Sequence, residues 1–285
     1  MTDLHVTSLG DGEPVVFVHG SFVRGGASWN AQRPLADRYR LHLVDRRGFG
    51  ASPPVERGED FERDAGDIAE LLGDGAHLVG SSYGAVVSLL AAGLRPEAVR
   101  SLTVIEPPAF TQAPASGAAC AMQGRVAAVM AMADELEPAA FYPAFLAAMG
   151  YDLESLGLSH WAQLCTGPRA PSVTEMRTSM YQRPPWDAVL PLDALAAAPF
   201  PKLVVAGGWD TATASTRASA GAALRAVCDA IAPRLGAELL VIPGALHTPH
   251  MGRPALFNAD LAAFLASASA GRRGVAGPAG PGADR

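Results

Sequence analysis

The sequence is poor in cysteine and in charged residues. It has three cysteines among 285 residues, and charged residues make up 18% of the chain. Cys120, Cys165 and Cys228 are widely spaced and odd in number, which disfavours a disulfide framework and fits no metal-ligand spacing. No cluster of histidine and glutamate at metal spacing is present either. We therefore expect free thiols and no metal.

Basic blocks and long apolar runs are also lacking. The net charge is −6, and no run of lysine and arginine suggests a groove for nucleic-acid phosphates. No apolar run approaches the ~20 residues of a membrane-spanning helix, and no basic, apolar leader opens the sequence. We expect a cytoplasmic protein that acts on a small molecule, without a nucleic-acid or membrane partner. The sequence is compatible with a homodimer.

Apolar or β-rich runs alternate with helical patterns along most of the chain. The runs expected as strands are residues 14–19, 39–44, 76–79, 101–105, 202–206 and 238–242. Such alternation predicts an α/β fold with a parallel sheet, and function gathers at the carboxyl ends of its strands. Six polar residues lie at or just beyond those ends: His19, Asp45, Ser82, Glu106, Asp210 and His247.

The alternation breaks in the middle of the sequence. Residues 110–195 show helical patterns and no convincing strand, so we expect a helical insertion over a core made of residues 1–109 and 196–268. Residues 269–285 are mostly Ala, Gly, Pro and Arg, and we expect them to be disordered.

Ser82 is the candidate nucleophile. It lies in Gly80-Ser81-Ser82-Tyr83-Gly84, between an apolar strand and a helical run. A sharp strand-to-helix turn exposes such a serine, and the flanking glycines let the two elements pass closely. A helix N-terminus behind Ser82 would also favour developing negative charge.

His247 is the candidate general base, because it lies on a loop after the last strand. His250 is its rival, but it approaches the final helix and we interpret it as a structural loop residue.

Two carboxylates compete to orient His247. Asp210 ends a strand after two glycines and is our first choice. Glu106 follows the strand before it in the sequence and is the competing third member, since a carboxylate there can reach the same histidine.

The oxyanion formed in acyl transfer needs backbone donors. The N–H of Tyr83, next to the nucleophile, is one candidate. The second is the N–H of Ser21 or of Phe22, in the loop His19-Gly20-Ser21-Phe22. The loop 45–52 lacks Gly-Lys-Ser/Thr, so no nucleotide or other cofactor is assigned.

Together these motifs resemble the α/β-hydrolase superfamily over residues 4–109 and 196–268. The matching segments are His19-Gly20, Asp45-x-Arg47-Gly48-x-Gly50-x-Ser52, Gly80-x-Ser82-x-Gly84, Gly207-Gly208-Trp209-Asp210 and Gly244-x-x-His247. The resemblance implies a mostly parallel, eight-stranded sheet flanked by helices, with residues 110–195 as a helical cap. It also implies a Ser-His-Asp mechanism through an acyl-enzyme. The N-terminus is short for the two antiparallel strands that open the family sheet.

We expect a serine hydrolase, carboxylesterase-like, for a small to medium and largely apolar ester, lactone or thioester. Cap residues expected to line its pocket are Phe141, Phe145 and Trp161, with Trp209 from the core; other candidates are Met122, Met130, Met132, Tyr142, Met149 and Tyr151. The alternatives are a carbon–carbon bond hydrolase, a cofactor-free perhydrolase or oxygenase, and a ligand-binding protein without activity.

Overall fold

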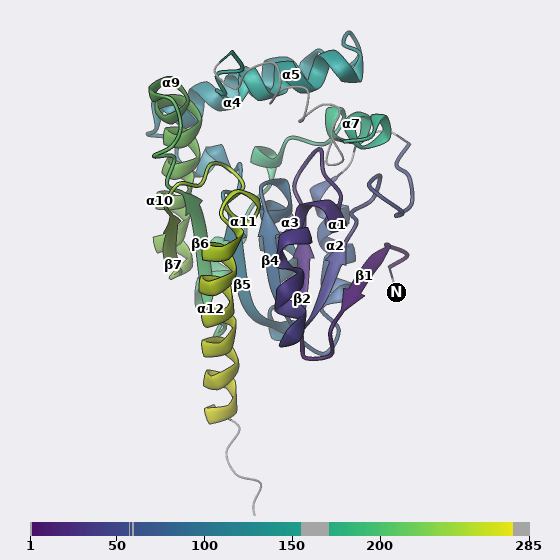
Figure 1. The fold of residues 1–285 in the computed structure, drawn as a ribbon, viewed down its shortest axis with the longest axis vertical. Helices are drawn as coiled ribbons and strands as arrows, with labels where there is room; N and C mark the ends of the chain where they lie inside the picture. The colour runs from purple at the N-terminus through teal and green to yellow at the C-terminus, as the bar shows by residue number, and fades with distance from the viewer. Residues whose placement is uncertain (1, 57, 59, 155–170, 276–285) are drawn as a thin grey trace, which may run out of the picture.

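The computed structural model describes residues 2–56, 58, 60–154 and 171–275. Their strands form one sheet of seven in the order β1-β3-β2-β4-β5-β6-β7 (Figure 1). The strands are β1 (Val6–Leu9), β2 (Glu13–Val18), β3 (Tyr39–Val44), β4 (Ala76–Ser81), β5 (Val99–Ile105), β6 (Lys202–Gly207) and β7 (Glu238–Ile242). Strand β1 pairs antiparallel to β3, and every other pairing is parallel.

The sheet confirms the expected fold class. Strands β3 and β7 have the bounds predicted from the sequence, and the other four predicted strands agree within two residues. Seven strands replace the expected eight in the described residues. Residues 2–12 hold one antiparallel strand, β1, where the resemblance implied two.

Two apolar layers cover the faces of the sheet. Alternate residues of β2 point to opposite faces, so Val16 and Val18 belong to one core cluster while Val15 and Phe17 belong to the other. The first face is covered by α2 (Phe61–Leu71), α3 (Tyr83–Leu94), α8 (Leu192–Ala197) and α10 (Ala222–Leu235). The second face is covered by η1 (Asn30–Asp37) and α12 (Pro254–Val275).

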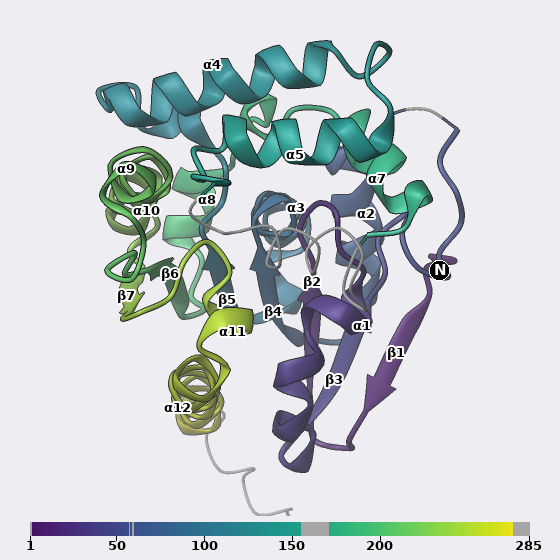
Figure 2. The ribbon, with the colours of Figure 1, turned by 45° about the horizontal axis from the view of Figure 1, so that its top comes forward.

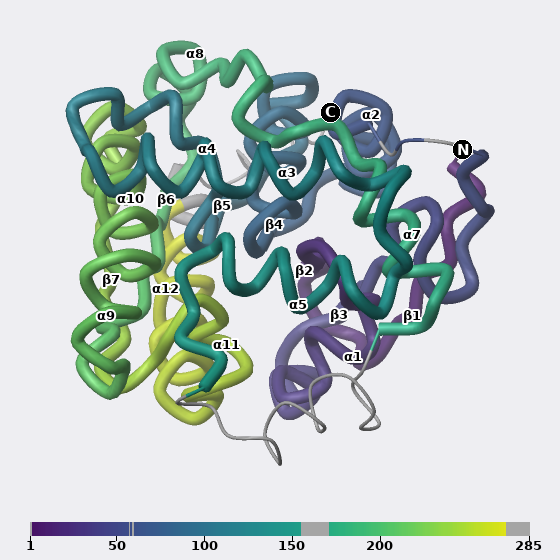
Figure 3. The backbone as a smooth tube through the Cα atoms, turned by 90° about the horizontal axis from the view of Figure 1, so that it is seen from above, coloured from purple at the N-terminus to yellow at the C-terminus, as the bar shows by residue number. Residues whose placement is uncertain are grey.

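Between β5 and β6 the described residues form helices and no strand. We call α4 (Gly117–Ala131), α5 (Pro138–Ala148) and α7 (Val173–Met180) the helical insertion. Figures 1 and 2 show α4 and α5 lying across one end of the sheet, and the view from above in Figure 3 shows them running over the strands. The remaining short elements are α1 (Gly25–Ser28), η2 (Pro96–Ala98), η3 (Phe110–Gln112), η4 (Pro185–Asp187), α9 (Ala214–Thr216), η5 (Arg217–Gly221) and α11 (Pro249–Gly252).

Helix α12 continues to Val275. The expectation of disorder from residue 269 is therefore wrong for residues 269–275, because Ala268 and Ser269 are buried against the body of the protein. Residues 276–285 lie outside the described part of the chain. No described helix has the length and the apolar character that a membrane crossing requires.

Candidate active site

Ser82 stands at a sharp turn between β4 and α3. Its backbone adopts φ 54° and ψ −124°, a conformation that an L-residue rarely holds. The turn is tight enough to require both predicted glycines: a Cβ on Gly80 would lie 2.3 Å from the Gly84 carbonyl oxygen, and one on Gly84 would lie 2.4 Å from the Val18 carbonyl oxygen. Because the strand and the helix pass this closely, the Ser82 side chain is held at the apex.

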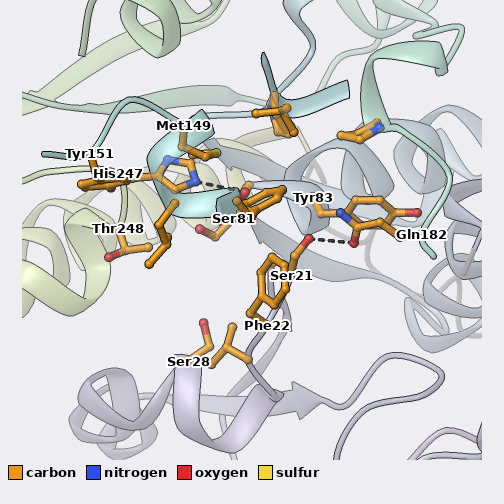
Figure 4. Close-up of a pocket in the computed structure, with 18 of the residues that line it drawn as sticks. Ser21, Phe22, Ser28, Ser81, Tyr83, Met149, Tyr151, Gln182, His247 and Thr248 are labelled. Carbon is orange, nitrogen blue, oxygen red and sulfur yellow. Dashed lines mark hydrogen bonds between the residues drawn. The ribbon is translucent and has the colours of Figure 1, made fainter. Parts of the chain in front are cut away.

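His247 lies beside Ser82, as expected. His247 is on the loop between β7 and α11, and its Nε2 is 3.0 Å from Ser82 Oγ. In Figure 4 the dashed line from the His247 ring marks this contact. A nucleophile and a base within hydrogen-bond reach are the first requirement for proton transfer from the hydroxyl.

The other ring nitrogen of His247 contacts Glu106. Nδ1 lies 2.9 Å from Glu106 Oε2, and the glutamate side chain is completely buried. A buried carboxylate needs donors, and Glu106 Oε1 accepts from the Gly207 amide at 2.8 Å and from Trp209 Nε1 at 2.9 Å. These two bonds fix Oε1 and leave Oε2 for the histidine.

The expectation that Asp210 orients His247 is therefore wrong for this structure. Asp210 is exposed, and its Oδ1 accepts from the Gly244 amide at 2.6 Å. The cause is the turn after β6: Trp209 adopts φ 55° and directs its indole to Glu106, so that Asp210 faces outward. Asp210 instead ties this turn to the loop that leads to His247.

Backbone strain is concentrated around this group of residues. Among the described residues, positive φ outside glycine occurs at Phe22, Ser82, Glu106 and Trp209. Each such residue costs on the order of 1–3 kcal/mol, and such strain clusters at functional sites. Three of the four are in direct contact with His247 or with each other: Ser82 and Glu106 contact His247, and Trp209 contacts Glu106. The strained backbone and the side-chain contacts therefore indicate the same site.

The loop after β2 lies against Ser82 and distinguishes the two candidate oxyanion donors. The Phe22 amide donates to Ser179 Oγ at 2.8 Å, so it is occupied by a contact with α7. Ser21 keeps its place on the cavity wall, and its hydroxyl donates to Gln182 Oε1 at 2.7 Å (Figure 4). Because the Phe22 amide is occupied, Ser21 is the remaining candidate for the second backbone donor.

A buried arginine holds this loop from below. Arg46 donates to the carbonyl oxygens of His19 and Gly20, both at 3.0 Å, and pairs with Asp64 at 2.8 Å. His19 Nε2 accepts from the Arg46 amide at 3.0 Å. Burial and the nearby Arg46 charge keep the pKa of His19 well below its usual value, so His19 shapes the loop as a neutral residue.

A cavity of about 470 Å³ opens between Ser82 and the helical insertion. Five predicted aromatic and methionine residues line it: Met130, Tyr142, Phe145, Met149 and Tyr151. Of the four pocket residues given priority, Phe145 lines the cavity, Phe141 packs behind it in the cluster with Phe22, and Trp209 is buried beneath the site. Trp161 lies outside the described residues.

Several lining residues were missed from the sequence. Phe110, Gln182 and Trp186 reach the cavity from short helices and turns without periodicity. Ser28 and His250 also line it. No sequence signal marks these positions, because each depends on how distant segments pack.

The cavity is apolar and free of fixed charge in the described part of its wall. No described lining residue is Lys, Arg, Asp or Glu. Burial and the nearby Glu106 carboxylate raise the pKa of Tyr151, which stays protonated. No group of three or more acidic, histidine or cysteine side chains among the described residues is placed to hold a metal ion.

Comparison with known proteins agrees with this architecture. The model of the family described as "Alpha/beta hydrolase family" matches residues 15–260. A pimeloyl-[acyl-carrier protein] methyl ester esterase of Aeromonas salmonicida is 39% identical over 108 residues, which cover 37% of this chain and 42% of that protein. The chain thus spans less than half the length of this relative.

Two solved structures share the fold. A thermophilic esterase of Thermogutta terrifontis has a TM-score of 0.64 at 24% identity, over 93% of both chains. A meta-cleavage product hydrolase of Pseudomonas fluorescens has a TM-score of 0.61 at 19% identity, over 93% of this chain and 94% of the other. Because the family model spans most of the chain and the sheet has the same architecture, the protein belongs to the alpha/beta hydrolase family.

Proposed function

We propose that this protein is a serine hydrolase whose triad is Ser82, His247 and Glu106. The observation that supports it most is the continuous chain of contacts from Ser82 Oγ to His247 Nε2 at 3.0 Å and from His247 Nδ1 to Glu106 Oε2 at 2.9 Å. A carboxylate on Nδ1 selects the tautomer in which Nε2 is free to accept the serine proton.

The reaction follows from these positions. His247 Nε2 takes the proton of Ser82 as Oγ attacks a carbonyl carbon, and Glu106 stabilises the imidazolium that forms. The oxyanion is bound by the backbone amides of Tyr83 and Ser21, and each such donor contributes on the order of 3 kcal/mol. His247 then protonates the leaving oxygen, and water activated by the same nitrogen releases the acid from Ser82.

The substrate class is proposed from the wall of the cavity. An apolar cavity of about 470 Å³ without Lys, Arg, Asp or Glu among its described lining suits a small to medium, largely uncharged ester. The relative from Aeromonas salmonicida, named as a methyl ester esterase, supports ester chemistry over the other reactions expected for this fold.

Labelling with a small fluorophosphonate, followed by intact mass and peptide mapping, tests the proposal. We expect one adduct on Ser82 in the wild type and none in Ser82→Ala, which also loses about 10³-fold or more in kcat. The control is Ser81→Ala, which removes the neighbouring hydroxyl and should still be labelled. A folded wild-type protein that takes up no label and hydrolyses no ester would contradict the proposed function.

A further inference from the structure

A second serine–histidine pair lies on the wall of the same cavity. Ser28 Oγ is 3.2 Å from His250 Nε2, and both residues line the cavity that contains Ser82 and His247. Ser28 ends α1, and His250 lies in α11, so the pair joins segments that are distant in the sequence. The acyl-transfer steps proposed above use neither residue.

The ring of His250 is fixed by its surroundings. It is 1% exposed, and its ring centroid lies 4.2 Å from that of Trp29. Its backbone carbonyl accepts from Gln32 Nε2 at 2.8 Å. Burial, with a smaller effect from His247, lowers the pKa of His250 to about 3. The imidazole is therefore neutral at neutral pH, and only one of its nitrogens bears a hydrogen.

The position of that hydrogen determines the direction of the bond to Ser28. Nδ1 of His250 is buried and has no hydrogen-bond partner among the described residues. Buried N–H groups without an acceptor are rare, whereas acceptors left unpaired are tolerated somewhat more often. The tautomer with hydrogen on Nε2 is therefore favoured, and His250 donates to Ser28 Oγ. This assignment follows from the hydrogen-bond network.

The hydroxyl hydrogen of Ser28 is then left to point elsewhere. Two other hydroxyls of the cavity differ in this respect: Ser21 donates to Gln182, and Ser82 lies against His247. Figure 4 shows Ser28 across the cavity from His247, beyond Phe22. A donor fixed in an apolar wall gives orientation and specificity to a ligand with a matching acceptor.

We propose that Ser28, oriented by His250, binds a second carbonyl oxygen of the substrate, so that the preferred substrates are esters with an oxo group in the acyl chain. This inference rests on the proposed ester hydrolysis for its substrate class. His250 acts here as a positioning residue, and Ser28 as the group that contacts the ligand.

The test compares esters of the same chain length. Methyl hexanoate is compared with methyl 3-, 4- and 5-oxohexanoate, and the measured quantity is the ratio of kcat/KM between each oxo ester and hexanoate. We expect one oxo isomer to exceed hexanoate by about ten-fold in the wild type, the effect of one hydrogen bond to a neutral group. Ser28→Ala should bring that ratio close to one, and His250→Phe, which keeps a flat ring against Trp29, should lower it.

A ratio within one variant separates recognition from general damage, because misfolding lowers the rates of both esters alike. Thr248→Val is the matched control, since Thr248 also lines the cavity and the change likewise removes one hydroxyl. This variant should keep the wild-type ratio. Equal kcat/KM values for all four esters in the wild type, or an oxo preference that survives Ser28→Ala, would overturn the proposal.

Binding separates this inference from the proposed function. Dissociation constants for the preferred oxo ester and for hexanoate are measured by calorimetry on Ser82→Ala and on Ser82→Ala/Ser28→Ala. Tighter binding of the oxo ester to Ser82→Ala, but not to the double variant, supports the role of Ser28. This holds even if the wild type hydrolyses neither ester, a result that would contradict only the proposed catalysis. If the two esters bind with equal dissociation constants to each variant, Ser28 does not recognise the oxo group, and the proposed hydrolysis is unaffected.

Discussion

Trp209 donates its indole N–H to the carboxylate that contacts His247. The Trp209 Nε1 to Glu106 Oε1 distance is 2.9 Å, and the Gly207 amide donates to the same oxygen at 2.8 Å. Two donors on one oxygen leave the other, Oε2, as the partner of His247 Nδ1. The orientation of His247 thus depends on a tryptophan that is not among the described residues lining the cavity.

This arrangement makes Glu106→Gln a severe change. The donors from Gly207 and Trp209 would hold the amide oxygen of the glutamine, so its NH₂ group would face His247. Nδ1 would then have to accept, Nε2 would bear the hydrogen, and Ser82 would lose its base. We expect kcat to fall by about 10³–10⁴-fold with the fold intact, measured by steady-state kinetics and circular dichroism.

Asp210→Asn is the matched comparison. Asp210 is exposed and accepts a hydrogen bond from the Gly244 amide, and the side-chain oxygen of an asparagine can accept the same bond. We expect less than a ten-fold loss in kcat, the reverse of the ranking predicted from the sequence. A larger loss for Asp210→Asn than for Glu106→Gln would return the acid to Asp210.

The ion pair of Arg46 and Asp64 should stabilise the folded protein and the loop that begins at His19. The two side chains are 0% and 2% exposed, and Arg46 also bonds the carbonyl oxygens of His19 and Gly20. Removing one partner leaves a buried charge uncompensated, so Asp64→Asn should lower the free energy of unfolding by about 3–5 kcal/mol in urea titrations.

An exposed pair on α10 provides the control for that change. Arg225 and Asp229 are 2.7 Å apart with side chains 44% and 50% exposed. Asp229→Asn should lower the free energy of unfolding by less than about 0.5 kcal/mol. Equal effects of the two substitutions would show that the Arg46 pair is not buried as described.

Stability should depend on pH through His250. Its pKa is about 3 in the folded protein because of burial, whereas the unfolded chain binds a proton near the usual value of 6.5. The unfolded state therefore gains protons first as the pH falls, and stability is lost below about pH 6.5. Between pH 7 and pH 5 the wild type should lose about 2 kcal/mol more of its unfolding free energy than His250→Gln. Parallel pH profiles of the two proteins in urea unfolding would refute a neutral, buried His250.

Local sequence patterns predicted most of the sheet and two of the three residues in the proposed triad. The strand signals are short apolar runs, and burial of both faces of a parallel sheet makes them continuous. Ser82 and His247 were identifiable because each lies in a short motif whose geometry depends on its immediate neighbours. The parallel pairings from β4 through β5 and β6 to β7 then bring the ends of β4 and β7, which Ser82 and His247 follow, to one edge of the sheet.

The choice between Glu106 and Asp210 had a different origin. Both residues follow neighbouring parallel strands, so position along the chain allows either to reach His247. The packing of Trp209 against Glu106 decided it, and that contact spans 103 residues. The pairing of Ser28 with His250 spans 222 residues and was equally hidden from the sequence.

The alternation of strands and helices, the sharp turn at Ser82 and the loop position of His247 could all be predicted from the sequence alone, because they depend on backbone sterics and local apolar patterns. Tertiary packing was needed to show which carboxylate contacts His247, that the Phe22 amide is bonded to Ser179, and which side chains line the cavity. Those choices depend on how buried polar groups find partners across the molecule, and no local pattern encodes such partners.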